Sequence, residues 1–87
     1  MYYVYVLLSK KDNKLYFGYT EDLNKRIEKH YNGKVSSTKY RLPMELIYYE
    51  AYKDRNDALQ REKSLKKSGR APEMLKRRLR YFLNKVQ

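Results

Sequence analysis

Residues 15–30, with the sequence LYFGYTEDLNKRIEKH, place groups that could transfer protons close to a fixed cation. Tyr16 supplies a phenol, His30 is the only histidine of the chain, and Arg26 precedes it by four residues. Residues four apart on a helix are neighbours, so we expect Arg26 and His30 on one edge of the same helix. Phosphodiester hydrolysis needs a base that takes a proton from water and a cation that holds developing negative charge.

Glu62 lies where a carboxylate is unexpected. Ala58 and Leu65 belong to the apolar stripe of a predicted helix, and Glu62 falls in the middle of this stripe. Burying a carboxylate is costly unless it is paired or binds a cation, and Lys66 is expected to point along the edge of the stripe. Two interpretations stay open: a carboxylate that holds a metal on a phosphate, or a partly buried glutamate bridged to a core tyrosine or an arginine.

Alternation along two predicted strands brings tyrosine hydroxyls to one region. Tyr5 shares a face of the first strand with Tyr3 and Leu7, and Tyr16 shares a face of the second strand with Gly18. A glycine inside a strand indicates a bulge or a close approach by a ligand or another backbone. Five side chains from four elements can therefore converge on one side of a three-stranded sheet, namely Tyr5, Tyr16, Arg26, His30 and Glu62.

Each of these residues also has a purely structural interpretation. The chain contains 11 tyrosines, and most of them are expected to pack with a solvated hydroxyl. A lone histidine beside an apolar stripe is usually a hydrogen-bonded core residue, and Arg26 by itself would be a surface cation. The combination of residue types across several elements is what favours an active site.

Local signals predict an α+β fold of order ββαβαα, with helices packed on a short sheet. The predicted elements are strands over residues 2–8, 15–19 and 44–52 and helices over about 20–31, 55–68 and 72–84, joined by a turn at 10–14 and a polar loop at 35–43. Thr20 is the expected N-cap of the first helix and Asp54 or Asn56 that of the second. Tyr31 is expected on the inner stripe of the first helix.

Length and hydropathy give the expected organisation and location. The 87 residues are expected to form one domain, with a core over about 1–70 and a basic C-terminal helix over about 72–85. No apolar run approaches the roughly 20 residues that span a bilayer, and no secretory pattern is present. We therefore expect a soluble, cytoplasmic protein.

Composition limits the partners and cofactors. The formal net charge is +11, and residues 60–87 carry ten Lys or Arg against two Asp or Glu. Such a basic segment suggests a polyanion, nucleic acid above all, while ribosome binding, a membrane surface or simple solubility stay open. With no cysteine and one histidine, a thiolate or multi-histidine metal site is excluded. A hard ion such as Mg²⁺, held by carboxylates, water and substrate oxygens, is favoured instead.

Several segments, taken in order, resemble the GIY-YIG nuclease superfamily. They are YVY at 3–5, YFG at 16–18 and TEDLNKRIEKHYNG at 20–33. The later PMELIYYE at 43–50 and ALQREKSLK at 58–66 resemble its short stand-alone bacterial branch. The match covers roughly residues 1–70, and its most specific parts are the Arg/His/Gly spacing of the helix and the A-L-x-R-E segment.

The resemblance implies a three-stranded antiparallel sheet flanked by helices and a metal-dependent endonuclease. Tyr5 and Tyr16 match the tyrosines of the two signatures. Tyr16 would act as or assist the general base with His30 relaying its proton, and Tyr5 would orient the site and water. Arg26 would stabilise the phosphate charge, and Glu62 would bind one divalent ion, Mg²⁺ or Mn²⁺.

Some positions depart from the family pattern. The first signature is YVY rather than GIY, Phe17 replaces an isoleucine in the second, and Met74 stands where many members carry an asparagine. Gly18, which is kept, would allow close packing beside the tyrosines.

Two functions are therefore carried forward from the sequence. The first is a metal-dependent endonuclease of DNA or another nucleic acid, and the second is a non-catalytic nucleic-acid-binding module on the same fold. An interaction protein whose charge is only solubilising is the remaining alternative. The expected nucleic-acid contacts are Lys66, Lys67, Arg70, Lys76, Arg77 and Arg78.

Overall fold

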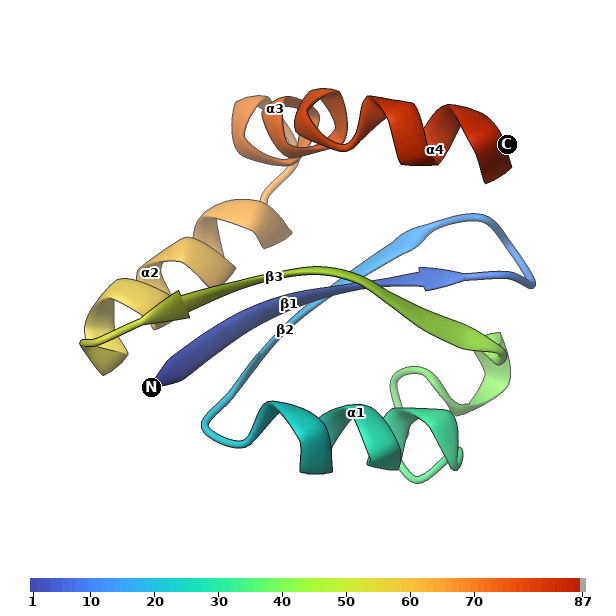
Figure 1. Cartoon of the computed structure of the whole chain (residues 1–87), viewed down its shortest axis with the longest axis horizontal. Helices are drawn as coiled ribbons and strands as arrows, with labels where there is room; N and C mark the ends of the chain where they lie inside the picture. Colours follow the sequence, from blue (N-terminus) through green and yellow to red (C-terminus); the bar gives the residue numbers. More distant parts are fainter. Residues whose placement is uncertain (87) are drawn as a thin grey trace.

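The computed structural model describes residues 1–86 and contains a small sheet between two layers of helices (Figure 1). The elements are β1 (Tyr2–Ser9), β2 (Leu15–Thr20), α1 (Leu23–Tyr31), a short 3₁₀ helix (Lys39–Arg41), β3 (Met44–Tyr52), α2 (Arg55–Lys66), α3 (Arg70–Arg78) and α4 (Arg80–Val86). The α+β fold predicted from the sequence is confirmed, with one more α-helix than expected and a short 3₁₀ helix in the predicted loop. None of the helices in residues 1–86 has the length and apolar character needed to cross a membrane.

The three strands form an antiparallel sheet of order β2-β1-β3. Tyr5 of β1 lies opposite Gly18 of β2, and Leu7 lies opposite Tyr16. The pairing of β1 with β3 shifts register after Val6, which leaves Ile47 as an extra residue on β3. Because β1 is central, its side chains are the most deeply buried, whereas β2 and β3 form the edges of the sheet.

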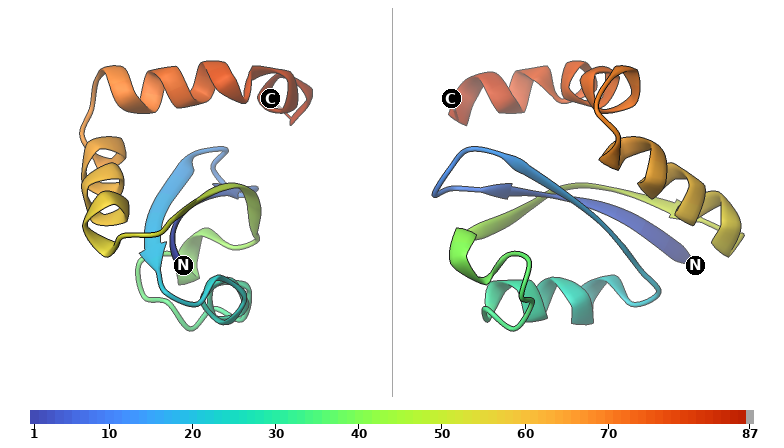
Figure 2. Two further views of the ribbon diagram at one scale, coloured as in Figure 1. Left: turned by 60° about the vertical axis from the view of Figure 1, so that its left-hand side comes forward. Right: turned by 180° about the vertical axis from the view of Figure 1, so that it is seen from behind.

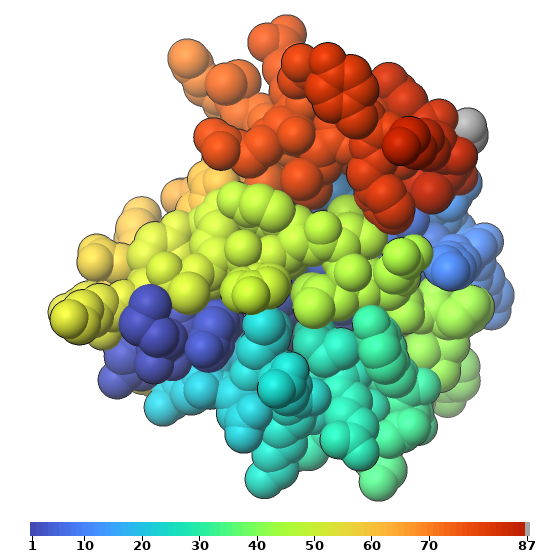
Figure 3. All heavy atoms as spheres, in the orientation of Figure 1, coloured from blue at the N-terminus to red at the C-terminus, as the bar shows by residue number. Residues whose placement is uncertain are grey.

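The two faces of the sheet carry separate cores. Val4 and Val6 of β1 pack on Ala58 and Leu65 of α2 and on Leu75 of α3. The alternate residues of β1 pack on the other face, where α1 covers them, and this second core contains Tyr5, Leu7, Ile27 and Met44. Figure 2 shows α1 on one side of the sheet and α2, α3 and α4 on the other. Figure 3 shows β3 crossing the visible face between these two helical layers.

The helix ends differ from the prediction in three places. Asp22, not Thr20, caps α1, because its side chain accepts a hydrogen bond from the Lys25 amide while Thr20 accepts one from the Asp22 amide in the preceding turn. Asp54 caps α2 as expected, but that helix ends at Lys66. The single helix predicted over 72–84 is divided at Leu79 into α3 and α4.

The predicted faces of α1 are only partly correct. Ile27 and His30 are buried as expected, but Tyr31 is half exposed and its hydroxyl accepts a hydrogen bond from the Leu46 amide. In the predicted polar loop, Val35 and Thr38 are buried beneath α1 and the sheet, and the segment contains the short 3₁₀ helix. Helical periodicity thus located the buried stripe but not its limit.

Gly18 is required by the ring of Tyr5, which lies directly over it. A Cβ at position 18 would be 2.2 Å from Cζ and 2.3 Å from the hydroxyl oxygen of Tyr5, far inside van der Waals contact. The predicted close approach at Gly18 is therefore an approach by the Tyr5 side chain, and it places the Tyr5 hydroxyl at the edge strand of the sheet.

Gly18→Ala is expected to lower the free energy of unfolding by about 1–3 kcal/mol, because the buried Tyr5 ring must leave its rotamer to make room. Urea denaturation followed by circular dichroism measures the change. Ser64→Ala, on α2 away from the ring, is the matched control and is expected to change little. A Gly18→Ala protein with unaltered stability would contradict the packing described above.

Candidate active site

A chain of hydrogen bonds joins Tyr5 of β1 to His30 of α1 and to the loop that follows. The Tyr5 hydroxyl is 2.8 Å from His30 Nε2, and His30 Nδ1 is 2.7 Å from Thr38 Oγ1. The Thr38 hydroxyl in turn donates to the Val35 carbonyl at 3.5 Å. Tyr5, His30 and Thr38 are all fully buried. The histidine is thus held at both ring nitrogens by hydroxyl groups.

These contacts define where the protons are. If Thr38 donates to Val35, its oxygen accepts from the Nδ1–H of His30, and Nε2 is left free to accept the proton of Tyr5. Burial and then the positive charge of Arg26 lower the pKa of His30 from 6.5 to about 4. A neutral imidazole is therefore present at neutral pH, and in this tautomer its Nε2 accepts the hydrogen bond of the Tyr5 hydroxyl.

Arg26 lies against the outer side of the same hydroxyl. Its Nε donates a hydrogen bond to the Tyr5 oxygen at 3.3 Å. This bond, opposed by burial, contributes most to raising the pKa of Arg26, and Tyr16 adds a smaller contribution. Burial raises the pKa of Tyr5, against the lowering effect of the Arg26 hydrogen bond. Tyr5 is therefore a protonated phenol held between a permanent cation and a neutral base.

Tyr16 lies beside this chain without a direct hydrogen bond to the histidine. Its ring centroid is 5.3 Å from that of His30 and 6.4 Å from that of Tyr5. Its hydroxyl accepts a hydrogen bond from Ser37 at 3.2 Å, at the surface. The role expected for His30, as the proton relay of Tyr16, does not match these contacts, because His30 bonds to Tyr5 instead.

Glu62 comes from the opposite helical layer. It lies on α2, which packs on the face of the sheet away from α1, so Glu62 approaches from a different helical layer than Arg26 and His30. Its negative charge nevertheless raises the pKa of Tyr5, so the carboxylate is near enough to act on that hydroxyl. The site thus straddles the edge strand β2, with Tyr5 reaching it over Gly18.

The surroundings of Glu62 also correct the expectation for Lys66. The Lys66 ammonium does not simply follow the edge of the stripe but forms an ion pair with Glu62 Oε2 at 3.0 Å, and the Glu62 side chain is 20% exposed. The neighbouring Arg61 makes two hydrogen bonds to Glu50 of β3. A half-buried carboxylate that already holds a cation is suited to bind a metal ion in its place.

The site offers few further metal ligands. Within residues 1–86 there is no group of three or more His, Cys, Asp or Glu side chains that could hold a metal ion. Any divalent ion at Glu62 would complete its coordination with water and phosphate oxygens, as Mg²⁺ commonly does.

The predicted nucleic-acid contacts lie along the end of α2 and on α3. All six are exposed, namely Lys66, Lys67, Arg70, Lys76, Arg77 and Arg78. Lys66 is paired with Glu62, so its charge is partly neutralised. Met74, at the position where many family members have asparagine, is half exposed on α3.

Sequence reasoning missed several residues around the site. Thr38, which holds His30, stood in a segment predicted to be a polar loop, and no sequence signal indicated its burial. Lys25 and Lys29 line a small cavity of about 180 Å³ together with Arg26. These two lysines are four residues apart, as Arg26 and His30 are, so the same helical periodicity could have predicted that they lie next to Arg26.

The sole histidine makes the pH dependence of stability interpretable. His30 has a lower pKa in the folded protein than its usual 6.5, so its contribution is fully present above pH 6.5 and is lost as the pH falls toward 4. We expect the free energy of unfolding to fall by about 2 kcal/mol between pH 7 and pH 5, a range above the usual pKa of carboxyl groups.

Urea titrations at several pH values measure this loss. In His30→Gln, the slope between pH 7 and pH 5 is expected to disappear, although the protein is less stable throughout. A wild-type slope that is retained in His30→Gln would show that another group titrates there.

Comparison with known proteins identifies the family. The family model described as "GIY-YIG catalytic domain" matches residues 1–78. The chain belongs to the GIY-YIG family. The resemblance inferred from the sequence is thereby confirmed, and the GIY-YIG match extends through α3, beyond the residue near 70 at which the sequence resemblance was placed.

Relatives and a solved structure agree with this assignment. A UPF0213 protein of Staphylococcus epidermidis is 44% identical over 66 residues, which cover 75% of this chain and 79% of the relative. A UPF0213 protein of Staphylococcus aureus is 41% identical with the same coverage. The solution NMR structure of a UPF0213 protein from Bacillus halodurans is 34% identical, covers 91% of this GIY-YIG chain and 85% of the other, and has a TM-score of 0.55.

Proposed function

We propose that the protein is a metal-dependent endonuclease that hydrolyses phosphodiester bonds of DNA or another nucleic acid. The observation that carries the proposal is the contact chain from Arg26 through the Tyr5 hydroxyl to His30. It joins a phosphate-binding cation to a phenol and a neutral base, while the nearby Glu62 carries the charge that a metal requires. Family membership adds independent support.

In the proposed reaction, water attacks phosphorus and the bond to the leaving oxygen breaks. The water proton passes to the Tyr5 oxygen as the Tyr5 proton passes to His30 Nε2, so that the phenol is regenerated and the imidazole becomes protonated. Arg26 is half-buried and covers the fully buried hydroxyl. When Arg26 turns to a phosphate, it uncovers Tyr5 for water and holds the developing charge.

Glu62 is the residue that would hold a divalent ion, Mg²⁺ or Mn²⁺. Such an ion stabilises negative charge on the phosphate and on the leaving oxygen. Occupation of the carboxylate by a cation would also remove the effect of its charge on Tyr5, which at present raises the pKa of that hydroxyl. Neutralisation of the Glu62 charge would therefore make the Tyr5 proton easier to release toward His30.

A second candidate is a nucleic-acid-binding module that does not cleave. It is favoured by the pairing of Glu62 with Lys66, by the absence within residues 1–86 of a group of three or more possible metal ligands, and by the exposed cations of α3. Phosphate contacts alone would give this module a salt-sensitive affinity. In that case binding would survive substitution of Glu62 and Tyr5 and weaken on charge reversal at Lys76, Arg77 and Arg78.

The test incubates the purified protein with plasmid, single-stranded DNA and RNA in Mg²⁺, in Mn²⁺ and in EDTA. We expect cleavage of at least one substrate with either metal and none in EDTA. Glu62→Ala, purified in parallel, is expected to be inactive with its fold intact. Cleavage that persists in Glu62→Ala would indicate a contaminant, and binding without any cleavage would favour the second candidate.

A further inference from the structure

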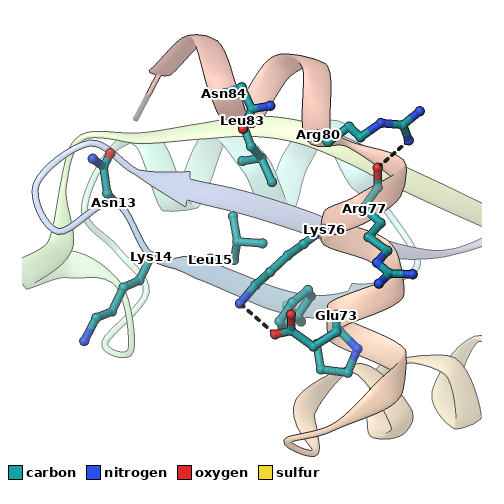
Figure 4. A pocket seen from close by; sticks show the side chains of 11 residues that line it. Asn13, Lys14, Leu15, Glu73, Lys76, Arg77, Arg80, Leu83 and Asn84 are labelled. Atoms are coloured by element: carbon teal, nitrogen blue, oxygen red, sulfur yellow. Dashed lines mark hydrogen bonds and ion pairs between the residues drawn. The ribbon is translucent and has the colours of Figure 1, made fainter.

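A groove with a volume of about 650 Å³ lies on the face of β2 opposite Tyr16. It runs between the β1–β2 hairpin and the helices α3 and α4. In Figure 4, Leu15 of β2 and Leu83 of α4 point toward each other across the groove, and Lys76 reaches into it from α3. Phe17 and Pro72 add to the apolar part of the lining.

The lining combines three kinds of group. Its floor is apolar, with Leu15, Phe17 and Leu83. Asn13 and Asn84 supply amides, each with donors and an acceptor. Lys14 and Lys76 supply positive charge, and the one carboxylate of the lining, Glu73, is already paired with Lys76 at 3.5 Å. A nucleotide has the complementary parts: a flat ring, a hydrogen-bonding edge and a phosphate.

The groove is adjacent to the candidate active site. Leu15 and Phe17 flank Tyr16 in β2, and alternate residues of a strand point to opposite faces. Adjacent Cα atoms are about 3.8 Å apart, and β2 is an edge strand to which no further strand of residues 1–86 pairs on its outer side. The right-hand view of Figure 2 shows β2 passing between α1 and the α3–α4 pair. A strand of nucleic acid laid over this edge would reach both the groove and Tyr16.

Building on the endonuclease function proposed above, we propose that this groove binds an unstacked base of the strand being cut. The floor of Leu15, Phe17 and Leu83 would take the face of the base, and Lys14 and Lys76 its phosphates. A base inside a duplex is stacked on both faces and cannot enter such a groove. The substrate class that follows is nucleic acid with a single-stranded segment beside the cleaved bond.

The test measures binding to Glu62→Gln protein in EDTA, so that no substrate is cut. The probes are fluorescein-labelled dT8 and an abasic phosphodiester of the same length and charge, followed by anisotropy near 100 mM salt. We expect dT8 to bind roughly tenfold more tightly than the abasic strand, because stacking on an aromatic ring contributes on this scale. In an eight-base-pair duplex the bases are already stacked, so they are expected to add nothing to its affinity for the protein.

Substitution of the two phenylalanines locates the effect. Phe17→Leu keeps the floor apolar but removes the ring, and the preference for dT8 over the abasic strand is expected to fall to about twofold or less. Phe82 is half-buried on α4 and does not line the groove. Phe82→Leu therefore serves as the matched control and is expected to retain the full preference.

Several results would overturn the inference. They are equal binding of dT8 and the abasic strand, a preference retained in Phe17→Leu, an octaglutamate peptide that competes as well as dT8, and no binding of dT8 at all.

A crosslinking experiment replaces the substitution if Phe17→Leu does not fold. A dT8 carrying 4-thiothymine must then crosslink to residues 13–17 or 83–84 of the Glu62→Gln protein, and crosslinks elsewhere overturn the inference. If wild type cleaves nucleic acid but dT8 binds no more tightly than the abasic strand, only the proposed role of the groove is refuted. If dT8 binds more tightly but no substrate is cleaved, only the proposed endonuclease function is refuted.

Discussion

Tyr5→Phe is expected to slow phosphodiester cleavage by about 10²–10⁴-fold, the usual contribution of a positioned acid–base group. The hydroxyl is the only connection between Arg26 and His30 in the contact chain. Its removal leaves His30 without a proton to accept and leaves Nε2 unpaired in a buried position. The variant is therefore also expected to lose about 1–3 kcal/mol of stability.

Single-turnover cleavage rates, measured at a temperature where both proteins are folded, test this expectation. Tyr16→Phe is the informative comparison, because the family resemblance gave Tyr16 the role of base. Within residues 1–86 the Tyr16 hydroxyl is hydrogen-bonded to Ser37 and not to His30, which leads us to expect a smaller loss, below about tenfold. Tyr40→Phe, at an exposed tyrosine, should be silent. A much larger loss in Tyr16→Phe than in Tyr5→Phe would reverse the assignment of the base.

Glu62→Gln is expected to reduce cleavage by about 10²–10³-fold or more, the scale on which a group that stabilises transition-state charge contributes. Glutamine keeps the size of the side chain but loses the charge that would hold a divalent ion. The loss is expected to be partly recovered at higher Mn²⁺ concentration, because the phosphate itself still binds metal. The measurement is the cleavage rate as a function of metal concentration.

The control for Glu62→Gln is a glutamate with no part in the site. Glu28 is exposed on α1 and, within residues 1–86, forms no ion pair. Glu28→Gln changes the net charge by the same amount and should leave the metal dependence unaltered. If both variants behave like wild type, Glu62 does not hold the metal.

The strands could be predicted because their signals are local. β1 is rich in aromatic and branched residues, the turn before β2 places Asn13 at a positive φ of 59°, and β3 was located at residues 44–52 as observed. The N-cap of α1 was placed two residues too early, at Thr20 instead of Asp22, because several caps are acceptable at the start of this helix. Thr20 and Asp22 can both accept from free amides, and only the tertiary structure decides between them.

The site was predictable in composition but not in connectivity. Helical spacing correctly placed Arg26 and His30 together, and strand alternation correctly placed Tyr5 and Tyr16 on one face. Spacing cannot say which tyrosine the histidine reaches, because that depends on how the Tyr5 ring crosses Gly18. The side from which Glu62 approaches and the support from Thr38 likewise depend on packing between elements distant in sequence.

Under the proposed function, Tyr5 and Glu62 serve one reaction across the edge strand β2. The most direct measurement is the single-turnover cleavage rate of wild type, Tyr5→Phe, Glu62→Gln and the double variant, purified in parallel and assayed in Mg²⁺. Substitutions of residues that act as a unit have strongly non-additive effects. We therefore predict that the cleavage rate of the double variant lies within about tenfold of the rate of the slower single variant. Equal cleavage by all four proteins would contradict the claim, as would losses in the single variants that multiply fully in the double variant.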